Sequence, residues 1–197
     1  MINKIYQITS IFICFLILSS CQKNVIYEDV VFNNSLLNNI NIMAEKKEIQ
    51  VSYVSILNEP FIDYVMETSP TKRVIWWLED NINHFGTENK LVIDIQNASI
   101  VRKGIDKEVK VNVAGIVKNQ SDYLYELNFK ILFLLYDDSD QILATTKVEV
   151  SRSTTSSQFI SLNESTRILD NLILDSLRDL SNKSIELIKL HMSKYIL

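Results

Sequence analysis

Residues 123–136 read YLYELNFKILFLLY, and this stretch decides the fold. Every second residue from Tyr125 to Leu135 is a large apolar or aromatic residue, and a period of two is typical of a strand with one buried face. The acidic run at 137–140 predicts a turn. Residues 142–153 then alternate again. We therefore predict an antiparallel hairpin at the centre of a sheet.

Two further strands are predicted on the N-terminal side of this hairpin. Residues 48–57 and 90–102 alternate in the same way, and the second run is disturbed near residues 97–99. Residues 104–122 carry valines at strand spacing, which leaves open a flap or an extension of the neighbouring strands.

Two helices carry clear start signals. Ser69 before Pro70 predicts a helix start, because serine is a preferred N-cap and proline fits the first helical position. Gly86 lies just beyond the predicted end of this helix. Ser161 and Glu164 form the S-x-x-E pattern of a capping box, which predicts a second helix running almost to the C-terminus.

The element order β-α-β-β-β-α predicts an α+β two-layer sandwich. We expect about four strands in a mostly antiparallel sheet, with two helices on one face. Residues 48–197 form this single domain, and a chain of 197 residues suffices for one domain with a tail. The side of the first helix that should face the sheet carries Val74, Ile75, Leu78, Ile82 and Phe85.

The N-terminus has the form of a signal peptide. Residues 8–18 read ITSIFICFLIL, an apolar run that covers only ~17 Å as a helix. The hydrocarbon core of a bilayer is ~30 Å thick, so a spanning helix is disfavoured. Small residues and a cysteine follow, in the order Leu18, Ser19, Ser20, Cys21.

These four residues resemble the lipobox of bacterial lipoproteins. The resemblance implies that residues 1–20 are removed, that the Cys21 sulfur receives a diacylglyceryl group, and that the new amino terminus is acylated. Such chains would anchor the protein stably to a membrane. Gln22 implies the outer membrane with the domain facing the periplasm, and inner-membrane retention is the alternative. An ordinary Cys21 thiol beside a cleavage site is the other reading.

Residues 21–47 are interpreted as the acylated cysteine followed by a tether. The segment is rich in asparagine and has no sustained period. As a flexible coil it would span ~28 Å. Val30, Phe32 and Leu37 are too apolar for a pure spacer, so we expect part of the tether to pack on the domain.

Composition and motifs argue against several functions. The chain has 20 Lys and Arg against 24 Asp and Glu, a net charge of -4, which disfavours nucleic acid as a partner. His84 and His191 lack metal-ligand spacing, and the acidic turn lacks the glycine and glutamate of a calcium loop. We therefore expect no metal, no cofactor and no catalytic residue.

Trp76 is the main candidate for binding. Its helical position predicts an exposed indole beside Arg73 and Asp80, which suits a partner hot spot or a membrane contact. Cover by the tether is the alternative. Lys130 lies on the predicted open face of the sheet, which we expect the tether or a partner to cover.

The lipobox, the element order and the stretch VEVSRSTTSSQFISLNES at 148–165 resemble a family of small bacterial envelope lipoproteins without an assigned function. More distantly, the layout is similar to the lipopolysaccharide-assembly lipoprotein and to auxiliary lipoproteins of ABC-type lipid transporters. This implies a non-catalytic accessory lipoprotein that binds an envelope protein or lipid. The alternatives are a periplasmic hydrolase with an unrecognised site, or a purely structural envelope lipoprotein.

Overall fold

The computed structural model of the chain describes residues 30–106 and 121–197. The predicted signal peptide, Leu18, Ser19, Ser20, Cys21 and most of segment 104–122 lie outside the described residues. In chain order the described elements are η1 (Asn34–Leu36), β1 (Ile40–Ile42), β2 (Lys46–Val51), η2 (Asp63–Val65), α2 (Pro70–Asn81), β3 (Ile82–His84), β4 (Lys90–Asp106), β5 (Ser121–Tyr136), β6 (Ile142–Ser157), α3 (Leu162–His191) and η3 (Ser193–Tyr195).

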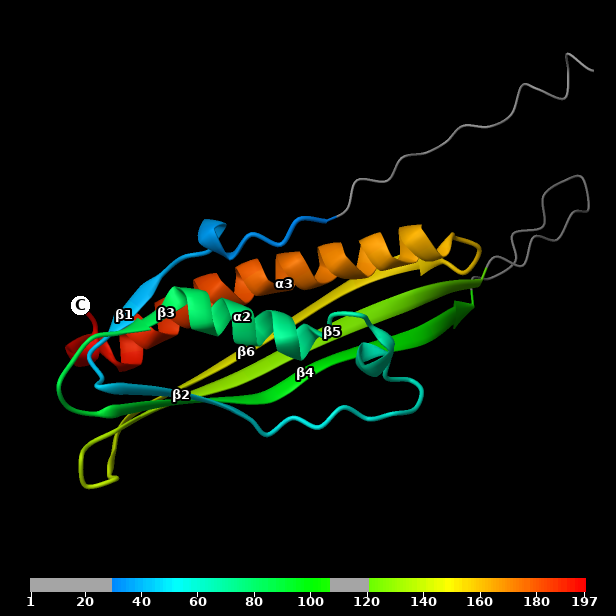
Figure 1. Cartoon of the computed structure of the whole chain (residues 1–197). Coiled ribbons are helices and arrows are strands. Elements are labelled where there is room, and N and C mark those ends of the chain that lie inside the picture. Colours follow the sequence, from blue (N-terminus) through cyan, green and yellow to red (C-terminus); the bar gives the residue numbers. More distant parts are fainter. Residues whose placement is uncertain (1–29, 107–120) are drawn as a thin grey trace, which may run out of the picture.

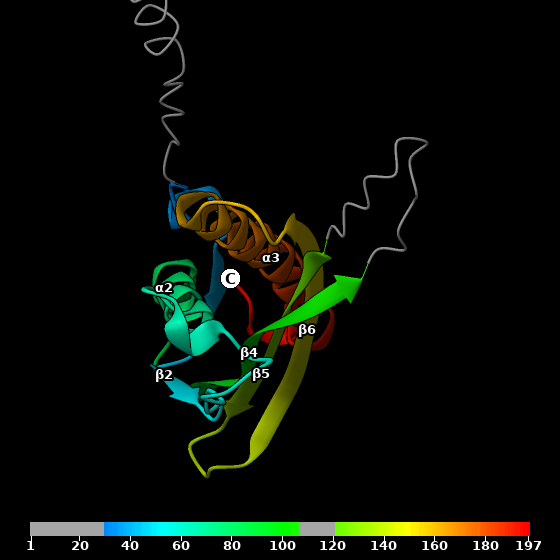
Figure 2. The same cartoon turned by 90° about the vertical axis from the view of Figure 1, so that its right-hand side faces the viewer.

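The main sheet has the order β2-β4-β5-β6. β2 runs parallel to β4, and the other two pairs are antiparallel. Helices α2 and α3 cover one face of this sheet (Figures 1 and 2), and both run in the same direction (Figure 1). The predicted α+β sandwich with a mostly antiparallel four-stranded sheet is confirmed.

The central strand β5 buries the side predicted from its period of two. It pairs with β4 on one side and with β6 on the other. The register of β4 shifts between Ile95 and Asn97, next to the predicted disturbance. The buried side chains of β5 in this set are Tyr125, Leu127, Phe129, Ile131, Phe133 and Leu135.

Strand β2 is shorter than predicted. It ends at Val51, and Leu57, the last residue of the predicted strand, lies outside it and is exposed. The backbone N–H groups of Ser52 and Tyr53 both donate to the carbonyl of Ile95, at 3.1 and 3.0 Å. The ladder between β2 and β4 therefore stops where the bulge of β4 changes the register.

Helix α2 begins as predicted and ends early. The Ser69 hydroxyl accepts a hydrogen bond from the N–H of Lys72, and Pro70 is the first helical residue. The helix stops at Asn81 because residues 82–84 form β3, which pairs in parallel with β1. The prediction that places Ile82 and Phe85 on the helix is wrong, because Ile82 is the first residue of β3 and Phe85 follows that strand and is exposed.

Gly86 therefore does not end the helix, and its position has another physical cause. A Cβ atom at Gly86 would lie 3.0 Å from the backbone nitrogen of Ala44. The small residue is required because the chain before β2 passes directly over it.

Helix α3 runs without interruption from Leu162 to His191. The Ser161 hydroxyl accepts a hydrogen bond from the N–H of Glu164 at 3.2 Å, which confirms the predicted cap. The side of the helix packed on the sheet buries Leu172, Ile173, Leu177, Leu180 and Ile188.

Part of the predicted tether packs on the domain, as expected. Leu37, Ile40 and Ile42 are buried, and Ile42 forms a bridge with Ile196 near the C-terminus. The side-chain amide of Asn81 donates toward the carbonyls of residues 34 and 37 at 3.0 and 3.1 Å. The described part of the tether thus lies beside the helices and does not cover the open face of the sheet (Figure 1).

Candidate functional site

An arginine on α2 lies between two aromatic rings. The guanidinium carbon of Arg73 is 3.5 Å from the ring centre of Phe32 and 5.4 Å from that of Trp76. Trp76 is 44% exposed, as its helical position predicts. The tether therefore reaches Arg73 but leaves much of the indole free. We call Phe32, Arg73 and Trp76 the aromatic patch.

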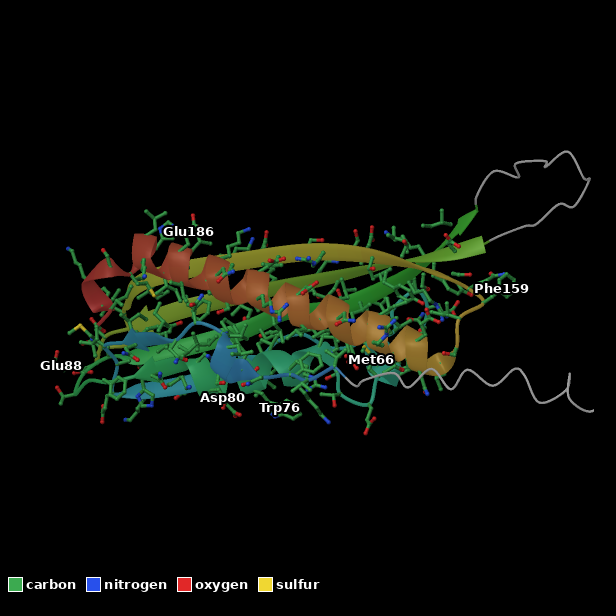
Figure 3. The ribbon with its side chains drawn as sticks, turned by 90° about the horizontal axis from the view of Figure 1, so that it is seen from above. Met66, Trp76, Asp80, Glu88, Phe159 and Glu186 are labelled. Atoms are coloured by element: carbon green, nitrogen blue, oxygen red, sulfur yellow. The ribbon has the colours of Figure 1, made fainter. Side chains whose placement is uncertain are left out.

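A polar contact of the tether lies one helical turn from Trp76 of the aromatic patch. The side-chain amide of Asn34 donates to the Asp80 carboxylate at 2.8 Å. Trp76 and Asp80 lie along one outer edge of the molecule (Figure 3). Because Trp76 and Asp80 are four positions apart on α2, they share one helical face.

A cleft of about 430 Å³ lies beside the aromatic patch. It is formed by the segment around η2, the start of α2, the first turns of α3 and the strands β4 and β5. Met66, labelled in Figure 3, lies near the first half of α3 in that view and lines the cleft. The apolar and aromatic side chains that line the cleft are Ile62, Val65, Met66, Tyr125, Leu162 and Leu169.

Two arginines and two carboxylates line the same cleft. Burial lowers the pKa of the Arg73 guanidinium, and the nearby Asp170 carboxylate opposes this shift. The Nε atom of Arg73 is buried and has no hydrogen-bond partner among the described residues. Arg102 forms an ion pair of 2.8 Å with Glu59. Glu67 and Asp170 also line the cleft, so its lining carries two positive and two negative side chains.

Lys130 lies on the other face of the sheet. Its neighbours Phe129 and Ile131 are buried beneath the helices, and side chains of a strand alternate between faces. The Lys130 ammonium is 3.9 Å from the Glu149 carboxylate, which also pairs with Lys147 at 2.6 Å. The three predicted binding residues therefore belong to two surfaces, with Trp76 and Arg73 together and Lys130 apart.

The two histidines lie in different environments. The Nδ1 atom of His84 is 3.4 Å from the backbone carbonyl oxygen of Ala44, and His191 is exposed at the end of α3. Within residues 30–106 and 121–197 no group of three or more His, Cys, Asp or Glu side chains could hold a metal ion. In the acidic turn, the Asp137 carboxylate accepts from the N–H groups of Ser139 and Gln141, both at 2.8 Å.

A buried carboxylate also lies close to the cleft. Tyr53 donates to the Asp63 carboxylate at 3.1 Å, and Asp63 is almost fully buried. Burial, followed by the charge and the hydrogen bond of Asp63, raises the pKa of the Tyr53 hydroxyl. This pair holds η2 against the irregular segment after β2, and so helps to fix one wall of the cleft.

Sequence reasoning missed the cleft because its walls come from distant segments. One local signal was present in β4. Ala98 and Ile100 are inward positions of that strand, and Arg102 continues the same side. A cation at an inward strand position requires a partner or a polar site there.

Comparisons with known proteins give the following result. No protein-family model matches the chain, and no curated protein matches it. A minor lipoprotein from Acinetobacter baumannii has 8% identity and a TM-score of 0.42, over 76% of this chain and 93% of that one. A Xanthomonas campestris protein of the DUF330 family has 12% identity and a TM-score of 0.32, over 78% and 89%.

A third solved structure is a neuraminyllactose-binding hemagglutinin homolog from Helicobacter pylori, with 12% identity and a TM-score of 0.36, over 86% of this chain and 96% of that one. At such identities and TM-scores none of the three bears on function.

No helix within the described residues has the length and hydropathy to cross a bilayer.

Proposed function

We propose that the chain is a lipid-anchored accessory protein of the bacterial envelope that binds a protein partner and catalyses no reaction. The anchor is Cys21, exposed as the new amino terminus after cleavage behind Ser20. The domain faces the periplasm from the outer membrane. The observation that carries the binding role is the half-exposed Trp76 of the aromatic patch.

The aromatic patch has the properties of a binding hot spot. Tryptophan and arginine are enriched among the residues that dominate binding energy. The Arg73 guanidinium lies over the rings of both Phe32 and Trp76, so these side chains lose little freedom when a partner binds. A rigid helix presents it, which favours a defined partner over non-specific adhesion.

The environments of the histidines support the non-catalytic part of the proposal. A general base needs a hydrogen-bonded partner to orient it and a nucleophile within reach. His84 contacts a backbone carbonyl, and His191 lies exposed near the C-terminus. Both arrangements suit structural or solvent-facing roles.

Photocrosslinking in living cells tests the binding role. A photoreactive amino acid at position 76 of the full chain should give a discrete protein adduct, because Trp76 lies in the proposed interface. Leu190 on α3 is the matched control, since it is also exposed but lies far along the chain from the patch. No adduct at position 76, or equal adducts at both positions, contradicts the proposal. An adduct at Lys130 alone would move the interface to the open sheet face.

Mass spectrometry of the membrane-derived chain tests the anchor. We expect the mature chain to begin at Cys21 and to carry acyl chains on its sulfur and amino group. Replacement of Cys21 by alanine should abolish acylation. An unmodified chain beginning at Met1 rules out the anchor.

A further inference from the structure

We propose that the cleft beside the aromatic patch binds the long acyl chain of a lipid and leaves the polar head of that lipid at its mouth. The inference goes beyond partner binding, and rests on the proposed membrane anchor for its supply of lipid. It is carried by the size, the lining and the position of the cleft.

The size of the cleft fits a single acyl chain. An apolar protein cavity of ~150 Å³ holds one benzene molecule, which has six carbon atoms. By the same proportion, the cleft of about 430 Å³ accommodates roughly 17 carbon atoms.

The lining of the cleft suits an uncharged chain. Apolar side chains form much of the wall, and the two arginines are balanced by two carboxylates. A peptide segment would bring backbone N–H and C=O groups that need partners in the cleft. An acyl chain brings none. Because each arginine already has a carboxylate nearby, Glu59 for Arg102 and Asp170 for Arg73, a free carboxylate at the mouth should not be strongly preferred over a neutral ester.

The mouth of the cleft exposes large apolar side chains. Leu162 is 82% exposed and Val65 is 66% exposed, and both line the cleft. Burying them against a methylene chain would remove this apolar surface from water.

The cleft can also reach the membrane surface. Phe32 contacts Arg73, which lines the cleft, so the tether passes close by. The nine residues 21–29, counted from Cys21 to the start of the described chain, can span at most about 32 Å. A domain tethered in this way stays within reach of bilayer lipid.

Photolabelling of the full chain in lipid nanodiscs tests the proposal. One arm uses palmitic acid carrying a diazirine on its chain, and the other uses phosphatidylethanolamine carrying the same chain. Peptide mapping should locate the label within residues 62–73 and 162–170. Labelling in the second arm identifies bilayer phospholipid as the source, and labelling only in the first identifies free fatty acid. The methyl ester of the palmitic acid probe should label as well as the acid.

Paired variants make the test specific. The double variant V65N/L162Q removes the apolar mouth, and labelling should fall about fivefold, as expected for the loss of two apolar contacts with the acyl chain. L190Q/L197Q is the matched control, because Leu190 and Leu197 are similarly exposed but lie outside the cleft. It should label like the wild type. All four substituted side chains are exposed. Circular dichroism of each variant checks that it still folds.

Two outcomes overturn the proposal. One is the absence of label from the cleft peptides in both arms. The other is label that is unchanged in V65N/L162Q or equally reduced in L190Q/L197Q. The palmitic acid arm works equally on a chain that carries no acyl anchor. Failure of the anchor and failure of the cleft are therefore separate results, and neither depends on the crosslink at Trp76.

Discussion

The ammonium group of Lys47 joins β2 to the end of α2. Its Nζ atom donates to the backbone carbonyls of Leu78, Glu79 and Ile82 at 3.0, 3.3 and 2.7 Å. Carbonyls in the last turn of a helix have no partner within the helix, and a cation there also interacts favourably with the helix dipole. We predict that Lys47→Met destabilises the domain by about 2 kcal/mol.

The magnitude follows from the three acceptors taken separately. The Leu78 carbonyl also accepts from the N–H of Ile82, and the Glu79 carbonyl is at an exposed contact. Both keep a partner or regain water in the variant. The Ile82 carbonyl is partly buried and makes the shortest of the three contacts. Losing a charged donor there costs about 1.5–3 kcal/mol. The variant also loses the interaction with the helix dipole, but it no longer has to remove an ammonium group from water, and these two effects offset each other.

Urea unfolding of the full chain in a mild detergent, followed by near-ultraviolet circular dichroism, measures this loss. Lys46→Met is the matched control, because the Lys46 ammonium is exposed and only reaches the Glu45 carboxylate at 3.9 Å. It should change the free energy of unfolding by less than about 0.5 kcal/mol. Equal losses in the two variants would refute the capping role of Lys47.

The same pair of variants predicts a pH dependence. Burial lowers the pKa of Lys47 below its usual 10.5, and Glu79 and Asp80 oppose the shift. A pKa that is lower in the folded state means that folding favours the neutral amine. The stability advantage of wild type over Lys47→Met should therefore widen as the pH rises through the lowered pKa toward 10.5. The difference in the free energy of unfolding between wild type and Lys47→Met should narrow again as the pH falls.

Three further predictions concern the tether and its contacts. Gly86→Ala should cost about 1–3 kcal/mol in urea unfolding, because the new Cβ meets a backbone nitrogen, whereas Gly104→Ala, with open space around it, should cost nothing. Asn81→Asp removes the amide donors to the tether, so hydrogen exchange of residues 34–39 should accelerate while the sheet stays protected, and equal protection in both forms would count against it. Phe32→Ala should make the Trp76 indole more accessible to acrylamide, and unchanged quenching would mean that the stack does not order it.

Local signals were sufficient for most of the main sheet and for both helix starts. The period of two in β5 and β6, and the serine caps at residues 69 and 161, depend only on neighbours in sequence. The structure confirms each of them. The disturbance near Asn97 was also visible, because polar and small residues interrupt an otherwise apolar alternation there.

Features that depend on contacts between distant segments were not predictable. Strands β1 and β3 have three residues each and pair across 42 positions of sequence, as Ile40 does with Ile82. Neither is long enough to show a period. The early end of α2 follows from that pairing, so it could not be predicted either. The cleft has the same origin, since its walls come from five separate elements and segments.

The two ends of the molecule serve different physical purposes. At one end, β1, β3, the Lys47 cap and the bridge between Ile42 and Ile196 join the tether, both helices and the C-terminus. At the other end α3 begins, and the cleft there is lined by the first turns of α3, the segment around η2 and the start of α2, with Val65 and Leu162 exposed. Substitutions at the mouth therefore leave the contacts that hold the fold intact. Variants of these two side chains should therefore remove the proposed binding at the cleft without unfolding the domain, which separates a loss of ligand from a loss of structure.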